Sequence, residues 1–207
     1  MLPLPVLKYD IIYIDPPWPY YGSTTKNAAA GKHYDLMSMD DIKALPIRES
    51  LNKTGACFCW TTGPKLHFGI QALEAWGLHY RGIAHIWAKC RKSDGQLIHG
   101  QGVPATYSKP TSELLLLATT CKKGRPFPLL DHKLPQIVAA PRGEHSAKPQ
   151  VFRDLIVKGY GDRSRLEMFA RGKVEGWHVW GDQAVPSSSQ LEAEAAFKLA
   201  GQPWAHC

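Results

Sequence analysis

Residues 9–18 have the sequence YDIIYIDPPW, and this stretch decides how the rest of the chain is interpreted. The β-branched and aromatic residues 9–14 are typical of a buried strand, which the prolines after Asp15 end. Ligands of α/β proteins bind beyond the carboxyl ends of strands, so residues 15–18 are the first candidate for a functional loop. The structural alternative is a proline-ended strand with Trp18 packed in the core.

Strand-like and helix-like patterns alternate along the chain. Strands are expected at residues 9–14, 56–62, 80–87, 113–119, 166–170 and 177–180, and helices between Ser38 and Pro46 and at residues 64–76 and 148–158. This alternation predicts an α/β fold with a mostly parallel central sheet and helices on both faces. Residues 19–33 and 91–111 lack a hydrophobic period and are expected to be surface loops. Residues 1–185 are expected to form one domain, followed at residues 186–207 by a C-terminal tail with a short helix.

The amino-acid composition favours a protein that meets nucleic acid and argues against a membrane protein, a disulfide-rich protein or a metal-binding protein. The chain has 207 residues, with 25 Lys and Arg against 18 Asp and Glu, and the resulting charge of +7 favours encounters with polyanions such as nucleic acid. No apolar run approaches the roughly 20 residues that span a bilayer, so no membrane association and a cytoplasmic location are expected. The five cysteines show no C-x-x-C spacing, which argues against a disulfide framework or a metal site. Cys57 and Cys59 are therefore interpreted as core residues.

The chemistry that the loop at residues 15–18 suits is methylation of an aromatic amine. Such a nitrogen is a poor nucleophile until acceptors hold its hydrogens. The Asp15 carboxylate supplies one acceptor and the Pro16 carbonyl the other, since Pro17 biases the residue before it toward an extended conformation. Trp18 is expected to stack on the flat ring of the nucleobase that carries this amine.

Several sequence blocks support this interpretation. The blocks are YDIIYIDPPW, HYDLMSMDDI, CFCWTTGPKL, GIAHIWAKC, TSELLLLAT, HSAKPQVFRDLI and RLEMFARGKVEGWHVWGDQ, in this order. With them the sequence closely resembles the adenine-amine methyltransferases, which include the catalytic subunit of the eukaryotic mRNA adenosine methyltransferase and many bacterial and phage DNA methylases. The resemblance covers about residues 8–183. It implies a class I (Rossmann-like) methyltransferase fold of permuted motif order, with S-adenosylmethionine as methyl donor.

The same resemblance implies the site residues. Asp15, Pro16, Pro17 and Trp18 correspond to the catalytic loop, Asp15 and Lys148 to the groups near the donor's amino group and carboxylate, Tyr34 to a tyrosine over the reacting centre, Phe169 and Arg171 to contacts with the donor's nucleoside, and Asp182 and Gln183 to contacts with its ribose and adenine. Glu113 matches a family glutamate without an assigned role. The structural alternatives are a loop aromatic for Tyr34, a solvated first-turn lysine for Lys148 and a plain turn for Asp182.

The function expected from these observations is methyl transfer to the exocyclic amine of adenine in DNA, by direct in-line transfer to a flipped-out base. Three alternatives stay open: an RNA adenosine methyltransferase, a glutamine-amide methyltransferase, and a non-catalytic nucleic-acid-binding relative. The partner is DNA or RNA, and a homodimer or a partner subunit is also left open.

Two further expectations concern the loops and the DNA. The chain begins too close to Asp15 to supply the upstream residues that help hold the donor's adenine in eukaryotic members, and the loop at residues 20–32 is a candidate lid. Phosphate contacts are expected from Lys89, Arg91, Lys92, Lys122, Lys123 and Arg125. Since no dedicated recognition helix or ribbon is evident, a short or relaxed sequence context is predicted.

Overall fold

The structure is a computed structural model that describes residues 6–19, 36–99, 110–143 and 147–200. The described strands form one sheet in the order β5-β3-β4-β2-β1-β6-β7. The strands are β1 (Tyr9–Ile14), β2 (Leu51–Thr61), β3 (His79–Cys90), β4 (Ser112–Thr119), β5 (Ile137–Pro141), β6 (Arg165–Met168) and β7 (His178–Trp180). The helices are α1 (Met39–Lys43), α2 (Ile47–Ser50), α3 (Leu66–Ala75), α4 (Val151–Tyr160) and α5 (Ser188–Ala200), and a 3₁₀ turn, η1 (Gly63–Lys65), precedes α3.

Most neighbouring strands run in the same direction. β1 is parallel to β2 and β6, β6 is parallel to β7, and β3 is parallel to β5, whereas β4 is antiparallel to both β2 and β3. The carboxyl ends of six strands therefore meet along one edge of the sheet, together with the amino-terminal end of β4. We call this edge the carboxyl edge. It confirms the predicted mostly parallel sheet.

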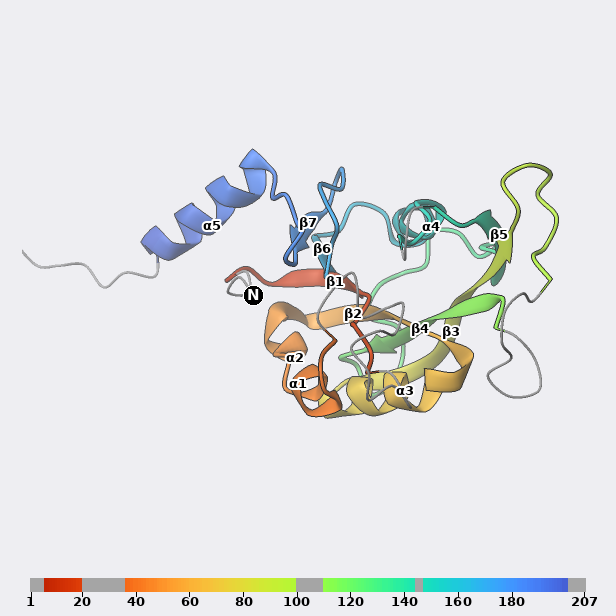
Figure 1. The fold of residues 1–207 in the computed structure, drawn as a ribbon. Helices are drawn as coiled ribbons and strands as arrows, with labels where there is room; N and C mark the ends of the chain where they lie inside the picture. The colour runs from red at the N-terminus through yellow and green to blue at the C-terminus, as the bar shows by residue number, and fades with distance from the viewer. Residues whose placement is uncertain (1–5, 20–35, 100–109, 144–146, 201–207) are drawn as a thin grey trace, which may run out of the picture.

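The sheet is buried on both faces. Because successive side chains of a strand point to opposite faces, β1 contributes Ile12 and Ile14 to one core cluster and Ile11 and Tyr13 to the other. Helices α1, α2 and α3 cover the first face and α4 covers the second (Figure 1). This layering confirms the expected helices on both faces and explains why the strand at residues 9–14 has no polar side.

Two predicted helix signals are confirmed in detail. The Ser38 hydroxyl accepts a hydrogen bond from the Asp41 N–H and caps α1. Gly77 follows α3 with φ 69°, a left-handed conformation that glycine adopts without strain. Two short elements were not predicted, α2 and β5. β5 is a short edge strand with the sequence IVAAP, and it lacks the alternation of polar and apolar residues that would have predicted its alternating burial.

The predicted tail contains α5. The Gln190 side chain, which is buried, accepts from the Val179 N–H at 2.9 Å and donates to the Val179 carbonyl at 3.1 Å, so the first turn of α5 is fixed to the outermost strand, β7. Beyond this turn the helix extends away from the sheet (Figure 1). The domain boundary at residue 185 stays a prediction. In the described part of the chain, no helix is long and apolar enough to cross a bilayer.

Candidate active site

A cavity of about 290 Å³ opens at the carboxyl edge, a size at the lower end of small-molecule sites. Its walls come from the residue after β1, the segment before α4 with the first turn of that helix, and β6 with the loop that follows it. The lining residues are Asp15, Ala147, Lys148, Gln150, Arg153, Glu167, Phe169, Arg171, Gly172, Lys173 and Val174. Four of the residues predicted from the sequence, Asp15, Lys148, Phe169 and Arg171, therefore line one cavity although they are far apart along the chain.

Four charged side chains alternate in sign beside this cavity. The Lys148 ammonium lies 2.8 Å from Asp15 Oδ2 and 3.0 Å from Glu113 Oε2, and the Lys89 ammonium lies 2.7 Å from Glu113 Oε1. We call Asp15, Lys148, Glu113 and Lys89 the charge chain. The Lys148 side chain is only 7% exposed and its ammonium also lies 5.5 Å from the centre of the Trp60 ring, so it is not the solvated lysine of the structural alternative.

The pKa directions follow from burial and from these contacts. Burial raises the pKa of Asp15, and the negative charge of Glu113 acts in the same direction against the opposing effects of Lys148 and Arg171. Burial would also raise the pKa of Glu113, but its two lysine partners outweigh burial and lower that pKa. Burial opposes the charge of Lys148, yet its two carboxylate partners hold its pKa above the ordinary value. Lys148 and Glu113 are therefore charged at neutral pH.

The backbone of the loop after β1 is held at several points. The Trp18 N–H donates to the Pro16 carbonyl at 2.8 Å, and the Met37 N–H donates to the Pro17 carbonyl at 3.2 Å. Lys65, at the end of η1, donates to the carbonyls of Trp18 and Pro19. The loop thus has a defined shape, and the Pro16 carbonyl keeps a second lone pair for another donor.

Trp18 lies in the core. Its side chain is 8% exposed, it belongs to the first core cluster, and its indole N–H donates to the Trp60 carbonyl at 3.0 Å. The ring as packed here is not available to stack on a base, because it is buried within this core cluster. The expected stacking is corrected for this conformation, whereas a part in catalysis for Trp18 stays a prediction.

The loops after β6 and β7 pack closely together. Phe169 has φ 60°, an uncommon left-handed conformation for a residue with a side chain, which costs roughly 1–2 kcal/mol. The Ala170 N–H donates to the Trp180 carbonyl at 3.0 Å, and a Cβ at Gly181 would come within 2.9 Å of the Ala170 nitrogen. Only glycine therefore fits at position 181. Backbone strain of this kind is concentrated at functional sites, which supports Phe169 as a cavity residue.

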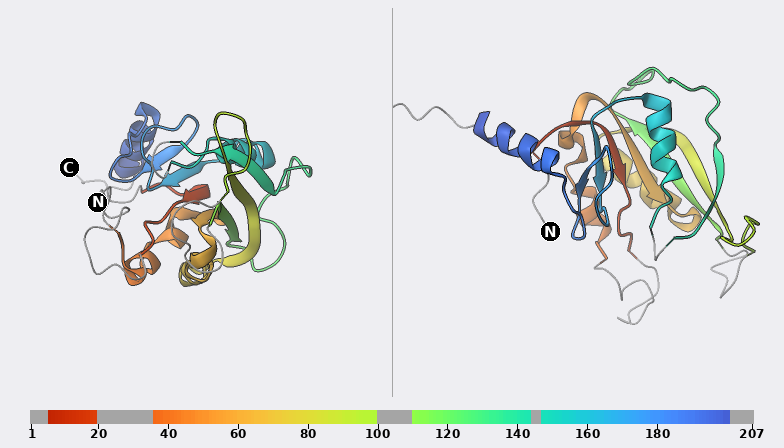
Figure 2. Two further views of the ribbon diagram at one scale, coloured as in Figure 1. Left: turned by 45° about the vertical axis from the view of Figure 1, so that its right-hand side comes forward. Right: turned by 90° about the horizontal axis from the view of Figure 1, so that it is seen from above.

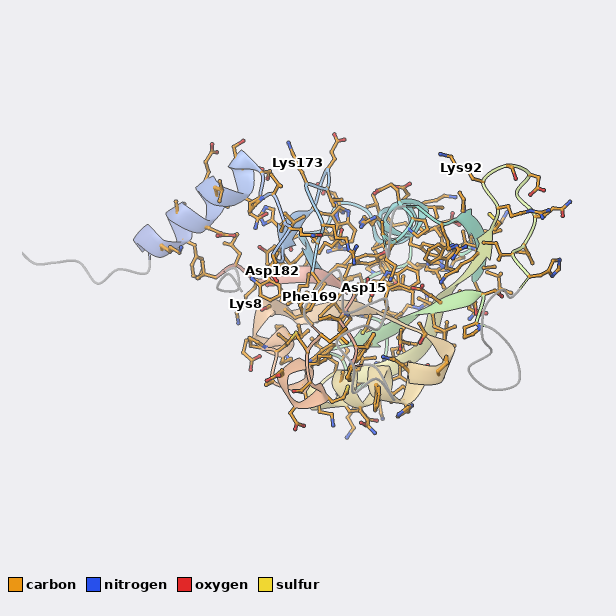
Figure 3. All side chains as sticks on the ribbon, viewed as in Figure 1. Lys8, Asp15, Lys92, Phe169, Lys173 and Asp182 are labelled. Atoms are coloured by element: carbon orange, nitrogen blue, oxygen red, sulfur yellow. The ribbon has the colours of Figure 1, made fainter. Side chains whose placement is uncertain are left out.

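Asp182 and Gln183 follow Gly181 and are exposed. Figure 3 shows Asp182 and Phe169 on neighbouring loops at the carboxyl edge. Neither Asp182 nor Gln183 is among the described residues that line the cavity, so their contacts with a ligand stay a prediction. Tyr34 lies outside the described residues, as do residues 20–33 of the first predicted loop and residues 100–109 of the second.

A buried ion pair was missed by the sequence analysis. The Arg153 guanidinium donates from Nε to Glu167 Oε2 at 2.6 Å and from Nη2 to Glu167 Oε1 at 2.5 Å, and it lies 5.3 Å from the centre of the Tyr13 ring. Both residues line the cavity. The signal available in the sequence was an acid, Glu167, between two apolar residues of a predicted buried strand, which requires a cationic partner.

The expected set of phosphate contacts does not form one surface. Lys89 is bound to Glu113, and Arg91 is bound to Asp94 and Gln96. Residues 122–125 follow β4, whose last residue, Thr119, pairs with Ala56; this pair is five residues, about 17 Å, from the carboxyl-edge end of β2. The right view of Figure 2 shows this loop, in green to teal, on the side opposite the end of β1. Arg91 and Lys92 follow β3 and are both exposed, and Figure 3 shows Lys92 on the loop after this strand.

The interpretation of the cysteines can also be compared with the structure. Cys57 and Cys59 are buried in the first core cluster, as predicted, and Cys207 lies outside the described residues. Among residues 6–19, 36–99, 110–143 and 147–200, no three His, Cys, Asp or Glu side chains are grouped so that they could hold a metal ion.

Comparisons with known proteins agree on one family. The MT-A70 family profile matches residues 9–183. The type II methyltransferase M.MunI from a Mycoplasma species is 31% identical, over 86% of this chain and 78% of its own length. The N6-methyladenosine RNA methyltransferase MTA1 of Pyricularia oryzae is 29% identical over 86% of this chain, and the N(6)-adenine-specific methyltransferase METTL4 of Homo sapiens is 29% identical over 87%. The chain spans 47% and 39% of the lengths of the last two relatives.

Proposed function

Since this chain belongs to the MT-A70 family, we propose that it transfers a methyl group from S-adenosylmethionine to the exocyclic amine of adenine in DNA. The observation that carries this proposal is the position of Asp15, which follows the central strand, lines the cavity and is bound to Lys148. DNA is favoured over RNA because the chain covers 78% of the type II methyltransferase M.MunI but 47% of the RNA methyltransferase MTA1.

The cavity residues fit S-adenosylmethionine. A carboxylate, an ammonium, an aromatic ring and a guanidinium meet there, and they match the amino group, the carboxylate and the nucleoside of such a ligand. Asp15 and Lys148 would hold the amino acid part, Phe169 and Arg171 the nucleoside, and Asp182 and Gln183 its ribose and adenine. The two ion pairs of Lys148 use two of its three N–H groups, which leaves one for the ligand. When bound, S-adenosylmethionine supplies an electrophilic methyl group on its sulfonium sulfur.

The chain's own residues act on the adenine amine. The Asp15 carboxylate and the Pro16 carbonyl accept the two amine hydrogens, so that the nitrogen lone pair is released from the ring and directed into the cavity. Lys148 keeps Asp15 in place and favours its ionised form, since an opposite charge at 2.8 Å stabilises the carboxylate. Asp15 acts as a hydrogen-bond acceptor that holds the amine more than as a strong base, and the nitrogen loses one proton during or after methyl transfer.

Two further parts of the proposal concern the substrate and the assembly. The base must leave the stack, since the amine of a paired adenine lies inside the duplex. A short or relaxed sequence context, a homodimer or partner subunit, and a cytoplasmic location stay predictions.

Asp15→Asn tests the function, because the amide keeps the size of the side chain and loses its charge. Methyl transfer to DNA and RNA oligonucleotides of the same sequence is measured with labelled S-adenosylmethionine, and donor binding is measured by calorimetry. We expect turnover on DNA to fall on the order of a hundredfold or more, as for other losses of a preorganised electrostatic contact. A folded, donor-binding variant with near wild-type turnover would contradict the role of Asp15. Faster transfer to RNA by the wild type would assign the RNA alternative.

The sequence context is tested separately. A plasmid methylated by the pure protein is sequenced with detection of methyladenine. We expect one or two defined bases beside the adenine. Methylation confined to five or more defined bases would contradict the prediction.

A further inference from the structure

Lys89 ends the charge chain and is not among the described residues that line the cavity. We propose that Lys89 is a positioning residue for methyl transfer: by neutralising Glu113, it leaves Lys148 bound to Asp15 and keeps Asp15 an ionised acceptor. This inference deepens the proposed function, on which its kinetic readout rests. The electrostatic part can be measured without any methylation.

The contact between Lys89 and Glu113 is built into the sheet. Glu113 pairs with Trp87 across β3 and β4, and the Lys89 N–H donates to the Thr111 carbonyl at 3.0 Å, so the backbone fixes both side chains next to each other. The side chains are 19% and 14% exposed. The Lys89 ammonium also lies 5.1 Å from the centre of the Trp87 ring. Lys89 is therefore a partly buried residue that is held against Glu113.

Glu113 is shared between the two lysines through different oxygens. Oε1 accepts from Lys89 and Oε2 accepts from Lys148. Without Lys89, the full charge of Glu113 would compete with Asp15 for the Lys148 ammonium. The charge chain would then hold one cation, Lys148, for the two carboxylates of Asp15 and Glu113. Little water is present there to screen their charges.

The other groups that act on Asp15 do not compensate for the loss of the positive charge of Lys89. Arg171, after β6, adds one cation. The Cys59 thiol of β2 and the Tyr13 phenol of β1 also lie near, but burial raises the pKa of both groups far above neutrality, so neither carries a charge. The charge at Asp15 is therefore set by Lys148, Glu113 and Arg171, and by Lys89 through Glu113.

This arrangement predicts shifts of opposite sign for two variants. Lys89→Met keeps the apolar stem and removes the cation, so the surroundings of Asp15 become more negative and its carboxyl should protonate at higher pH. Glu113→Gln removes an anion and should move the Asp15 titration to lower pH. The double variant removes one charge of each sign and should return the titration toward the wild-type midpoint, and Lys89→Arg should preserve it.

The experiment follows the Asp15 carboxyl by ¹³C NMR in protein labelled at aspartate, with Asp15→Asn to assign the signal. The pH dependence of kcat and KM is measured in parallel. Lys89→Met should raise the midpoint of the Asp15 titration, and the acidic limb of the kcat profile, by about one pH unit. A shift of this size is expected when one nearby charge is removed from a partly screened site. Lys123→Met, the same change on an exposed lysine at the opposite edge of the sheet, should move neither.

The opposite shifts separate this role from simple packing. A structural role of Lys89 would lower stability in Lys89→Met but would not raise the Asp15 midpoint in that variant or return it in the double variant. An unchanged Asp15 midpoint in Lys89→Met would overturn the inference. If that variant does not fold, Glu113→Gln decides, because an unshifted midpoint there overturns it equally. A wild type that titrates as expected but methylates neither DNA nor RNA would refute the proposed function and leave the electrostatic inference standing.

Discussion

Arg153→Met should destabilise the protein strongly, because it leaves a buried carboxylate without its partner. The Arg153 and Glu167 side chains are 11% and 8% exposed, and two hydrogen bonds of 2.6 and 2.5 Å join them. Removing one partner of a buried ion pair typically costs about 3–5 kcal/mol. For a protein of this size, each kcal/mol corresponds to roughly 2–4 °C in Tm, so we expect a fall of roughly 6–20 °C.

The expected loss is measured by urea denaturation and by thermal scans at neutral pH. Lys158→Met is the matched control: it removes a cation from the same helix, but from a surface pair with Asp131 in which the lysine side chain is 65% exposed. Exposed pairs contribute little, so this variant should be close to the wild type. In the double variant Arg153→Met, Glu167→Met no charge is left unpaired, and most of the lost stability should return.

The same pair has a functional consequence. Arg153 Nη1 also donates to the Lys148 carbonyl at 3.3 Å, and Glu167 stands two residues before Phe169. Arg153→Met should therefore loosen both walls of the cavity and weaken the binding of S-adenosylmethionine. The reasoning is refuted if Arg153→Met unfolds at the same urea concentration as Lys158→Met, or if the double variant is as unstable as the single one.

The other predictions concern donor binding, the loop after β1 and the cations that we expect to contact nucleic acid. Lys148→Ala should weaken S-adenosylmethionine binding by about 1.5–3 kcal/mol in calorimetry, and an unchanged Kd would show that Lys148 serves Asp15 alone. Lys65→Met removes the donor to the carbonyls of Trp18 and Pro19 and should lower kcat roughly tenfold through a less ordered loop; a change confined to KM would contradict this. Lys92→Glu should reduce the slope of log K against log salt concentration for duplex binding by the amount expected for about one phosphate contact. Lys122→Glu, at the opposite edge of the sheet, should leave this slope unchanged.

The sequence predicted the centre of the sheet better than its margins. β1, β2, β4 and β6 are largely buried, and the apolar runs of β1, β2 and β4 stand out from the flanking segments. β5 lies at an edge, pairs with β3 and exposes Ile137 while Ala140 is buried, and its uniformly apolar sequence does not reveal this alternation. The predicted start of one strand was also wrong. β2 begins at Leu51, five residues before the predicted start, because Asn52 to Gly55 contain no apolar run that would indicate a strand.

The role of Glu113 could not be predicted because it depends on the direction of a strand. The rule that ligands lie beyond the carboxyl ends of parallel strands indicated the loops after β1 and β6, which line the cavity, and it also predicts a part for the loop after β7. Glu113 stands at the beginning of a strand, where that rule expects nothing. Since β4 is antiparallel to both neighbours, its first residues meet the carboxyl edge, and Glu113 is brought to Lys148. No local pattern in residues 112–119 distinguishes the two directions.

The charge count shows the same dependence on topology. The charge chain and the Arg153–Glu167 pair contain three cations and three carboxylates, so the remaining residues carry the entire net charge of +7. Counting lysines nevertheless treats Lys89 as surface charge, and counts Lys122 as equal to Lys92 although they lie at opposite edges of the sheet. Net charge governs how the protein attracts a polyanion at long range. Strand order and direction decide which cations can contact the polyanion once it reaches Asp15.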